Sequence, residues 1–113
     1  MPMKINRRQQ NGVTILDLSG TITVGEGDIE LREAVNDEME NGTRNLLLNC
    51  ASVTTIDSAG VGGLVSSYTT AQKRGGNLKL LNLSQRANNL LVITKLMSVF
   101  EIHDDEKEAV ASF

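Results

Sequence analysis

The chain has few of the residues that build disulfides, metal centres and aromatic clusters. Its 113 residues include one cysteine, Cys50, one histidine, His103, one proline and no tryptophan. A single cysteine excludes an internal disulfide and favours a reducing compartment. The sequence contains no cluster of metal-ligating residues, so we expect no metal and no other cofactor. Because aromatic residues make up only 3% of the chain, Leu, Val, Ile, Ala and Met must form the core.

The charge pattern and the length of the apolar runs argue against two further classes of protein. The formal net charge is −3 at pH 7, and lysine and arginine are scattered, without the basic stripe of a nucleic-acid-binding domain. No apolar run is long enough to span a bilayer, and no basic-then-apolar leader opens the chain. We therefore expect a cytoplasmic protein that contacts neither nucleic acid nor membrane and acts by binding partners.

Strand and helix signals alternate along the chain. The predicted strands are residues 3–9, residues 13–18 with a short extension over 21–24, and residues 45–49, 78–81 and 99–102. The predicted helices are residues 28–40, 58–74 and 84–97, and a terminal helix capped by Asp104 or Asp105. Alternation after an opening hairpin predicts an α/β fold, in which crossover connections make a mostly parallel sheet. We expect a single domain over residues 1–113, with four to five strands in a mixed sheet and about four helices.

Turn and cap residues set the limits of these elements. Asn11-Gly12 is a hairpin signal between the first two strands, and Ser19-Gly20 is expected to end the second strand. Asp28 and Ser84 are predicted N-cap residues. Gly42 is the predicted C-cap of the first helix.

The most informative segment is residues 53–64, VTTIDSAGVGGL. It connects a strand predicted to be buried on both faces to a helix, which places Ser58 on or next to the helix N-cap. A hydroxyl there is exposed at the positive end of the helix dipole, where a phosphate is favoured. Asp57 can bond backbone N–H groups of the turn or meet a basic group of a partner. Gly60 is expected to let the turn and the helix start pack closely.

The helix after Ser58 carries an unusual face of small residues. Each interior glycine costs about 1 kcal/mol relative to alanine, so a close approach by other atoms must favour these residues. One explanation is a partner protein docked on this face, and the other is tight packing of the helix against the sheet inside the domain. The residues of this face are Gly62, Gly63, Ser66, Ser67, Thr69 and Thr70.

A catalytic role for Ser58 finds no support in the residues around it. A hydrolase elbow requires Gly-x-Ser-x-Gly and a base, but Ile56 stands two residues before Ser58 and His103 lies far along the chain. The glycines of residues 60–63 match neither the dinucleotide-binding nor the P-loop pattern. We therefore expect a binding protein and not an enzyme.

Three segments of the chain resemble the STAS domain, named after sulphate transporters and anti-sigma factor antagonists. Asp57-Ser58-Ala59-Gly60-Val61 after a buried strand is similar to the most specific motif of the family. Residues 18–22, Leu-Ser-Gly-Thr-Ile, resemble its strand-then-glycine signature, and residues 90–102 resemble its third helix and last strand. The resemblance covers nearly the whole chain. The stand-alone form of the domain, without a membrane region, is similar to bacterial anti-sigma factor antagonists.

The resemblance implies a mechanism of partner switching. Ser58 would be phosphorylated by a partner that is both anti-sigma factor and serine kinase, and the unmodified chain would bind this partner and free a sigma factor. A phosphatase acting on phosphorylated Ser58 would restore the unmodified state, and the chain itself would be a monomer or a weak dimer. The expected partner-contact residues are Thr23, Thr55, Asp57, Ser58, Ala59, Gly60, Gly62 and Gly63. The acidic loop over residues 25–30 is a second candidate contact region.

The chain departs from the family pattern at two positions. The family usually has acidic residues where this chain has Asn49 and Thr23. Other STAS domains act as scaffolds of stress-sensing assemblies or as accessory components of transport machines, and this role is the alternative to antagonism. A nucleotide ligand has been suggested for the family, but no residue of this chain argues for one.

Overall fold

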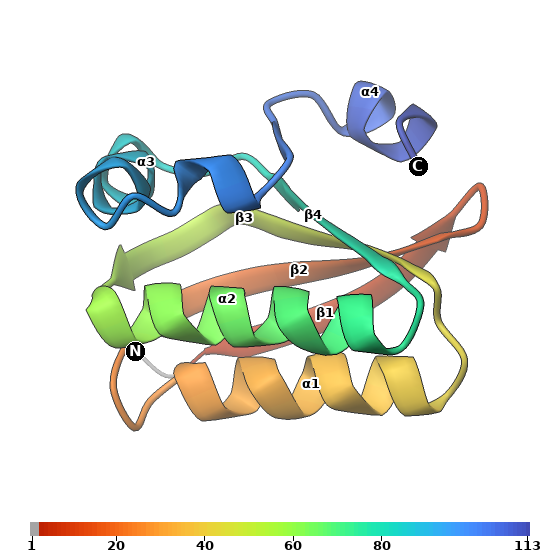
Figure 1. Cartoon of the computed structure of the whole chain (residues 1–113), viewed down its shortest axis with the longest axis horizontal. Helices are drawn as coiled ribbons and strands as arrows, with labels where there is room; N and C mark the ends of the chain where they lie inside the picture. Colours follow the sequence, from red (N-terminus) through yellow and green to blue (C-terminus); the bar gives the residue numbers. More distant parts are fainter. Residues whose placement is uncertain (1–2) are drawn as a thin grey trace.

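A mixed five-stranded sheet forms the centre of the structure, a computed structural model that describes residues 3–113 (Figure 1). The strand order follows the chain, and only the pairing of β1 with β2 is antiparallel. The strands are β1 (Lys4–Gln10), β2 (Val13–Ile22), β3 (Asn45–Ile56), β4 (Asn77–Leu81) and β5 (Ile102–His103). The helices are α1 (Asp28–Glu40), α2 (Ser58–Lys73), α3 (Gln85–Ile93) and α4 (Glu106–Ala111), with a 3-10 helix η1 (Met97–Val99). The predicted α/β fold with a mostly parallel sheet and an N-terminal hairpin is confirmed.

Apolar side chains pack on both faces of the sheet, because successive residues of a strand point to opposite sides. Leu16 and Leu18 of β2 belong to the larger of two apolar clusters, to which α1, α2 and α3 also contribute side chains. Val13 and Ile15 belong to a second cluster, in which Ala109 of α4 is fully buried. Helices α1 and α2 lie side by side along one face, and α4 lies across the sheet from them (Figure 1).

Several predicted turns and caps are confirmed. Asn11 and Gly12 have φ angles of 51° and 80°, which are the two positive values that a type I′ hairpin turn requires. Ser84 Oγ accepts a hydrogen bond from the Ala87 N–H and caps α3. Of the two candidates for the last helix, Asp105 is the N-cap.

The central strands are longer than predicted. Ser19-Gly20 does not end β2, which continues to Ile22, and β3 continues past Asn49 to Ile56. Residues 52–56 of β3 pair with residues 19–22 of β2, although the register shifts once just before this stretch, between Asp17 and Ser19, and once within it, between Gly20 and Thr21. Each shift gives β3 one extra residue, which is the geometry of a β-bulge. Pairing between two distant segments thus keeps this polar, glycine-containing stretch in the sheet.

The segment after β4 was predicted less accurately. Helix α3 ends at Ile93 and not near Met97, because Lys95 adopts a left-handed conformation with φ of 62°. The predicted strand over residues 99–102 is wrong in its bounds. Residues 97–99 form η1, and β5 has two residues, Ile102 and His103.

The start of α1 also differs from the prediction. Gly27 is the N-cap and Asp28 is the first helical residue, because the Glu30 carboxylate accepts a hydrogen bond from the Gly27 N–H. Asn41 is the C-cap, and Gly42 follows it with φ of 94°.

Over residues 3–113, none of the helices is both long enough and apolar enough to cross a membrane.

Candidate functional site

Ser58 lies where β3 passes directly into α2. Asp57 is the N-cap residue, with extended backbone angles, and its Oδ1 accepts a hydrogen bond of 2.9 Å from the Gly60 N–H. Ser58 is therefore the first residue of the helix, next to the N-cap as predicted. The side chain of Ser58 is exposed, and its hydroxyl makes no hydrogen bond to any residue within 3–113.

The N-terminal end of α2 offers a favourable environment for an anion. The first backbone N–H groups of a helix lack intrahelical acceptors, and the dipole gives this end a partial positive charge. Helix α1 carries Asp28 and Glu30 in its first turn, but α2 carries no acidic residue there. Beside Ser58, the Asp57 carboxylate offsets part of this positive charge.

Asp57 also holds the loop between β2 and α1. Its Oδ2 accepts a hydrogen bond of 3.3 Å from the N–H of Val24, a residue 33 positions earlier in the chain. Of the two roles considered for Asp57, backbone bonding is the one that the structure contains. Both carboxylate oxygens are thus occupied by backbone donors from two different segments.

Glycine is required at two positions near Ser58, Gly60 at the start of α2 and Gly27 at the start of α1. A Cβ on Gly60 would lie 2.0 Å from the carbonyl oxygen of Ile22, so the predicted close packing of the turn and the helix start is confirmed. A Cβ on Gly27 would lie 2.0 Å from the carbonyl oxygen of Thr21, and Gly27 also has φ of 89°. The sequence did not single out Gly27, although its place in a Gly-x-Gly loop before α1 was a usable signal.

The other expected contact residues lie at the same end of the sheet. Thr23 follows β2 directly, and its N–H donates a hydrogen bond of 2.7 Å to the carbonyl oxygen of Glu26. Thr55 is exposed one residue before the end of β3 and is paired in register with Thr21. Because β2 and β3 are parallel neighbours, their carboxyl ends bring Thr23, Thr55 and Ser58 to one edge of the sheet. Ala59 is half-buried beside Ser58.

The small-residue face of α2 divides into two parts. Gly63 and Ser67 are buried inside the domain, and a Cβ on Gly63 would lie in ordinary van der Waals contact with Asp28 of α1, at 3.6 Å. The neighbour of Gly63 is thus another helix and not the sheet. Gly62 is half-buried, and a Cβ there would meet only the Arg32 guanidinium, at 3.9 Å. The hydroxyl of Ser67 is buried without a hydrogen-bond partner in the part of the chain that the structure describes.

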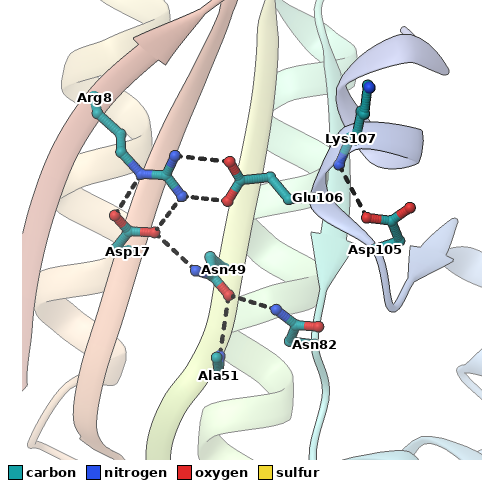
Figure 2. A network of polar contacts seen from close by, with 8 residues as sticks. All are labelled: Arg8, Asp17, Asn49, Ala51, Asn82, Asp105, Glu106 and Lys107. Carbon is teal, nitrogen blue, oxygen red and sulfur yellow. Dashed lines mark hydrogen bonds and ion pairs between the residues drawn. The ribbon is translucent and has the colours of Figure 1, made fainter.

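The structure also contains a polar network that the sequence did not reveal. The Arg8 guanidinium bonds both Asp17 of β2, with Nε to Oδ2 at 2.7 Å, and Glu106 of α4, with Nη1 to Oε2 at 2.9 Å (Figure 2). Hydrogen bonding to Arg8 is the main cause that lowers the pKa of both carboxyl groups. Arg8 and Glu106 are 98 positions apart, so no local pattern predicts their contact.

The same network accounts for an amide, and not an acid, at position 49. The Asn49 Nδ2 donates a hydrogen bond of 2.8 Å to Asp17 Oδ1. Its Oδ1 accepts from the Ala51 N–H at 3.2 Å and from the Asn82 Nδ2 at 3.3 Å (Figure 2). A carboxylate at position 49 would face that of Asp17, so the amide suits a site where Asp17 already supplies the negative charge.

His103 has contacts, but they do not form a catalytic relay. Glu101 Oε2 lies 2.6 Å and Ser112 Oγ 3.3 Å from the same ring nitrogen, Nε2. A serine hydrolase instead places the carboxylate and the serine on opposite nitrogens.

Cys50 is buried, and burial raises the pKa of its thiol to about 12. Residues 3–113 contain no group of three or more His, Cys, Asp or Glu side chains placed to hold a metal ion.

Comparison with known proteins gives consistent results. The model of the STAS domain family matches residues 4–109. The anti-sigma-B factor antagonist of Bacillus subtilis is 31% identical over 102 residues, which cover 90% of this chain and 92% of that protein. The anti-sigma F factor antagonist of Paenibacillus polymyxa is 22% identical over 110 residues, with coverage of 97% and 94%.

Solved structures of low sequence identity share the fold. An anti-sigma factor antagonist from Mycobacterium paratuberculosis superposes with a TM-score of 0.84 at 17% identity, over 97% of this chain and 92% of that one. The phosphorylated form of the Bacillus cell fate determinant SpoIIAA gives a TM-score of 0.73 at 17% identity, over 96% and 98%. At these identities the likeness supports the fold alone.

Proposed function

The chain belongs to the STAS domain family, and on this premise we propose that it is an anti-sigma factor antagonist switched by phosphorylation of Ser58. In the unmodified state it binds an anti-sigma factor that is also a serine kinase, and a sigma factor is released. Transfer of phosphate to Ser58 ends this binding, and a phosphatase reverses the change. Thr23 and Thr55, at the same end of the sheet as Ser58, and Ala59 and Gly62 in the first turns of α2 contribute to the bound surface.

One observation supports the proposal most strongly. The Ser58 hydroxyl is exposed and unbonded within residues 3–113, on a turn held by Asp57 and by the close contact at Gly60. A kinase can therefore reach the hydroxyl without opening the domain. Because the turn is fixed, a chemical change at this hydroxyl directly alters the surface that a docked protein contacts.

Phosphorylation is expected to leave the domain folded. A phosphoserine carries a charge of about −1.5 to −2 at pH 7. The N-terminal end of α2 compensates part of that charge, by about 0.3–1 kcal/mol at an exposed position. Because the Ser58 hydroxyl makes no hydrogen bond within residues 3–113 that the phosphate would break, the cost inside the domain is repulsion from Asp57.

The same phosphate strongly affects a partner packed over Ser58. The partner meets added volume and a doubly charged group that it must strip of water, which costs several kcal/mol unless it supplies cations. A loss of about 1.4 kcal/mol already weakens binding tenfold. A change at one hydroxyl can thus release the partner without a large change of shape.

In this proposal the chain is a phosphate acceptor and a binding surface rather than an enzyme. The carboxylate next to Ser58, that of Asp57, is held by two backbone N–H groups and does not contact the hydroxyl. Removal of the Ser58 proton therefore falls to a base of the kinase. Hydrolysis of the phosphate likewise falls to the separate phosphatase.

Purification of the tagged chain from its own cells, followed by phosphosite mapping, tests the proposal. We expect an ATP-binding serine kinase to be recovered with the wild-type chain, and phosphate to be found on Ser58. The Ser58→Ala variant should recover the same kinase but carry no phosphate at this position. Recovery of a large assembly without a kinase, or a Ser58 that is never modified, would contradict the proposal and favour the scaffold alternative.

A further inference from the structure

We infer that Val24 and Ile29 form an apolar contact that anchors the partner beside Ser58, and that this partner surface has an apolar hollow bordered by basic groups. The inference rests on the proposed function, because the occupant it assigns is the anti-sigma factor kinase. It adds residues from a different segment of the chain, which comprises the connection between β2 and α1 and the first turn of α1.

Both side chains are large, apolar and open to solvent. The exposed fraction is 74% for Val24 and 48% for Ile29. The described part of the chain has two other large hydrophobic residues as exposed as these, Val92 and Ile93, and they lie at the end of α3. Single exposed apolar residues are common on protein surfaces, so what distinguishes Val24 and Ile29 is the surrounding structure that holds them.

The loop that carries Val24 is fixed by hydrogen bonds. Thr23 and Glu26 exchange two backbone hydrogen bonds, of 2.7 Å and 3.0 Å. The Gly27 N–H is bound by the Glu30 carboxylate, and a Cβ on Gly27 would overlap the Thr21 carbonyl oxygen. An apolar side chain on a fixed loop loses little conformational entropy when a partner covers it.

The loop is joined directly to the phosphorylation site. The Val24 N–H donates to Asp57 Oδ2, and Asp57 Oδ1 caps the helix that Ser58 opens. A single carboxylate therefore sets the position of Val24 relative to Ser58. A partner that packs over Ser58 meets the β2–α1 loop as part of the same surface, and this continuity assigns the occupant.

The charges around the two residues determine the chemistry of the partner surface. The ionisable residues of the loop and of the first turn of α1 are Glu26, Asp28 and Glu30, all acidic, and the first cation of α1 is Arg32. Glu26 and Glu30 are exposed. A partner that covers Val24 and Ile29 without repulsion must carry basic groups opposite these carboxylates.

Binding of the purified kinase recovered with the wild-type chain, measured by titration calorimetry, tests the inference. The variants are Val24→Ser and Ile29→Ser, with Val92→Ser as the matched control, because Val92 is 60% exposed on α3. Val24→Ser keeps the backbone N–H that bonds Asp57, so only the apolar side chain is lost. We expect each of the first two variants to weaken binding by about tenfold, and the control to bind as the wild type does.

Two further measurements distinguish a lost partner contact from a folding defect and test whether the partner surface carries basic groups. At saturating kinase, Val24→Ser should be phosphorylated on Ser58 at the wild-type rate, with only the KM raised, because the hydroxyl and its turn are unchanged. Wild-type affinity should fall as salt is added, and Glu26→Gln should reduce this salt dependence. An affinity that does not change with salt would overturn the basic border of the partner surface.

Ser58→Asp, measured in the same titration, distinguishes failure of the inference from failure of the proposed function. If Ser58→Asp weakens binding but Val24→Ser and Ile29→Ser bind like the wild type, the anchor is wrong and the switch stands. If Val92→Ser weakens binding as much as Val24→Ser does, the contact is not confined to this loop, and the inference also fails. If Ser58→Asp binds like the wild type, the proposed function itself has failed.

Discussion

Asp57 and Val24, which are 33 positions apart, are joined by a hydrogen bond of 3.3 Å from the Val24 N–H to the Asp57 Oδ2. The other oxygen of Asp57 binds the Gly60 N–H at 2.9 Å. One side chain thus caps α2 and fixes the β2–α1 loop next to Ser58. The placement of Asp57 directly before Ser58 consequently orders two segments of the proposed binding surface.

The two bonds of Asp57 can be separated by mutation. Asp57→Ala loses both and should lower the free energy of unfolding by about 0.5–2 kcal/mol, the range of lost N-caps. Asp57→Asn retains an oxygen for the Gly60 N–H, and asparagine caps helices about as well as aspartate, so most of the stability should remain. Its NH2 group cannot accept from Val24, so amide hydrogen exchange at Val24 should become faster in both variants. Urea unfolding and exchange measured by NMR check these outcomes, and unchanged exchange at Val24 would contradict the bond.

Gly60 and Gly62 provide a matched pair two positions apart in α2. Gly60→Ala places a methyl group 2.0 Å from the Ile22 carbonyl oxygen, so the junction must move, at a cost of about 1–3 kcal/mol or more. Gly62→Ala meets only the flexible Arg32 side chain, at 3.9 Å, and should stabilise the helix by up to about 1 kcal/mol. Urea unfolding of both variants measures the difference, and equal effects would contradict the described contact.

Asn49→Asp should destabilise the domain in a pH-dependent way. The new carboxylate would face Asp17, where the Asn49 amide now donates a hydrogen bond of 2.8 Å. At neutral pH we expect a loss of about 1–3 kcal/mol, as for a charged group whose hydrogen-bond partner is removed. The loss should shrink as acid protonates one of the two carboxyl groups. Asn49→Ala is the control, and its loss of stability should lack this dependence on pH.

Stability should fall in acid through the contacts that hold the last two elements. Lys79 and then His103 lower the pKa of Glu101 to about 2, and Arg8 lowers the pKa of Glu106 below its ordinary value of 4.5. A carboxyl group with a lowered pKa in the folded state stabilises the fold above its unfolded pKa, and this stability is lost as pH falls through the folded pKa. The urea midpoint should therefore drop between pH 4.5 and about 2. In Glu106→Gln the drop should be smaller, and an unchanged profile would contradict a stabilising contact between Arg8 and Glu106.

Local signals predicted the parts of the structure that depend on nearby residues. The Asn11-Gly12 turn requires only its own positive φ angles, and Ser84 and Asp105 bond N–H groups two or three positions away. The place of Ser58 at the start of α2 is predictable in the same way, because the strand, the cap and the helix follow one another directly in the chain.

The parts that were missed depend on distant partners. The second half of β3 contains small polar residues and is a strand because β2 lies beside it. Gly63 and Ser67 resemble a docking face in the sequence, but both are buried, and α1 lies against Gly63. The bond between Arg8 and Glu106 joins the two ends of the chain. In each case tertiary contacts determine the outcome, and these contacts leave no periodic pattern in the sequence.

The affinity of the co-purifying kinase for three forms of the chain tests the central claim most directly. Titration calorimetry should compare the wild type, Ser58→Ala and Ser58→Asp under the same conditions. Phosphorylation as a binding switch predicts that the wild type and Ser58→Ala bind equally well and that Ser58→Asp binds at least about tenfold more weakly. Equal affinities for all three forms would contradict the switch.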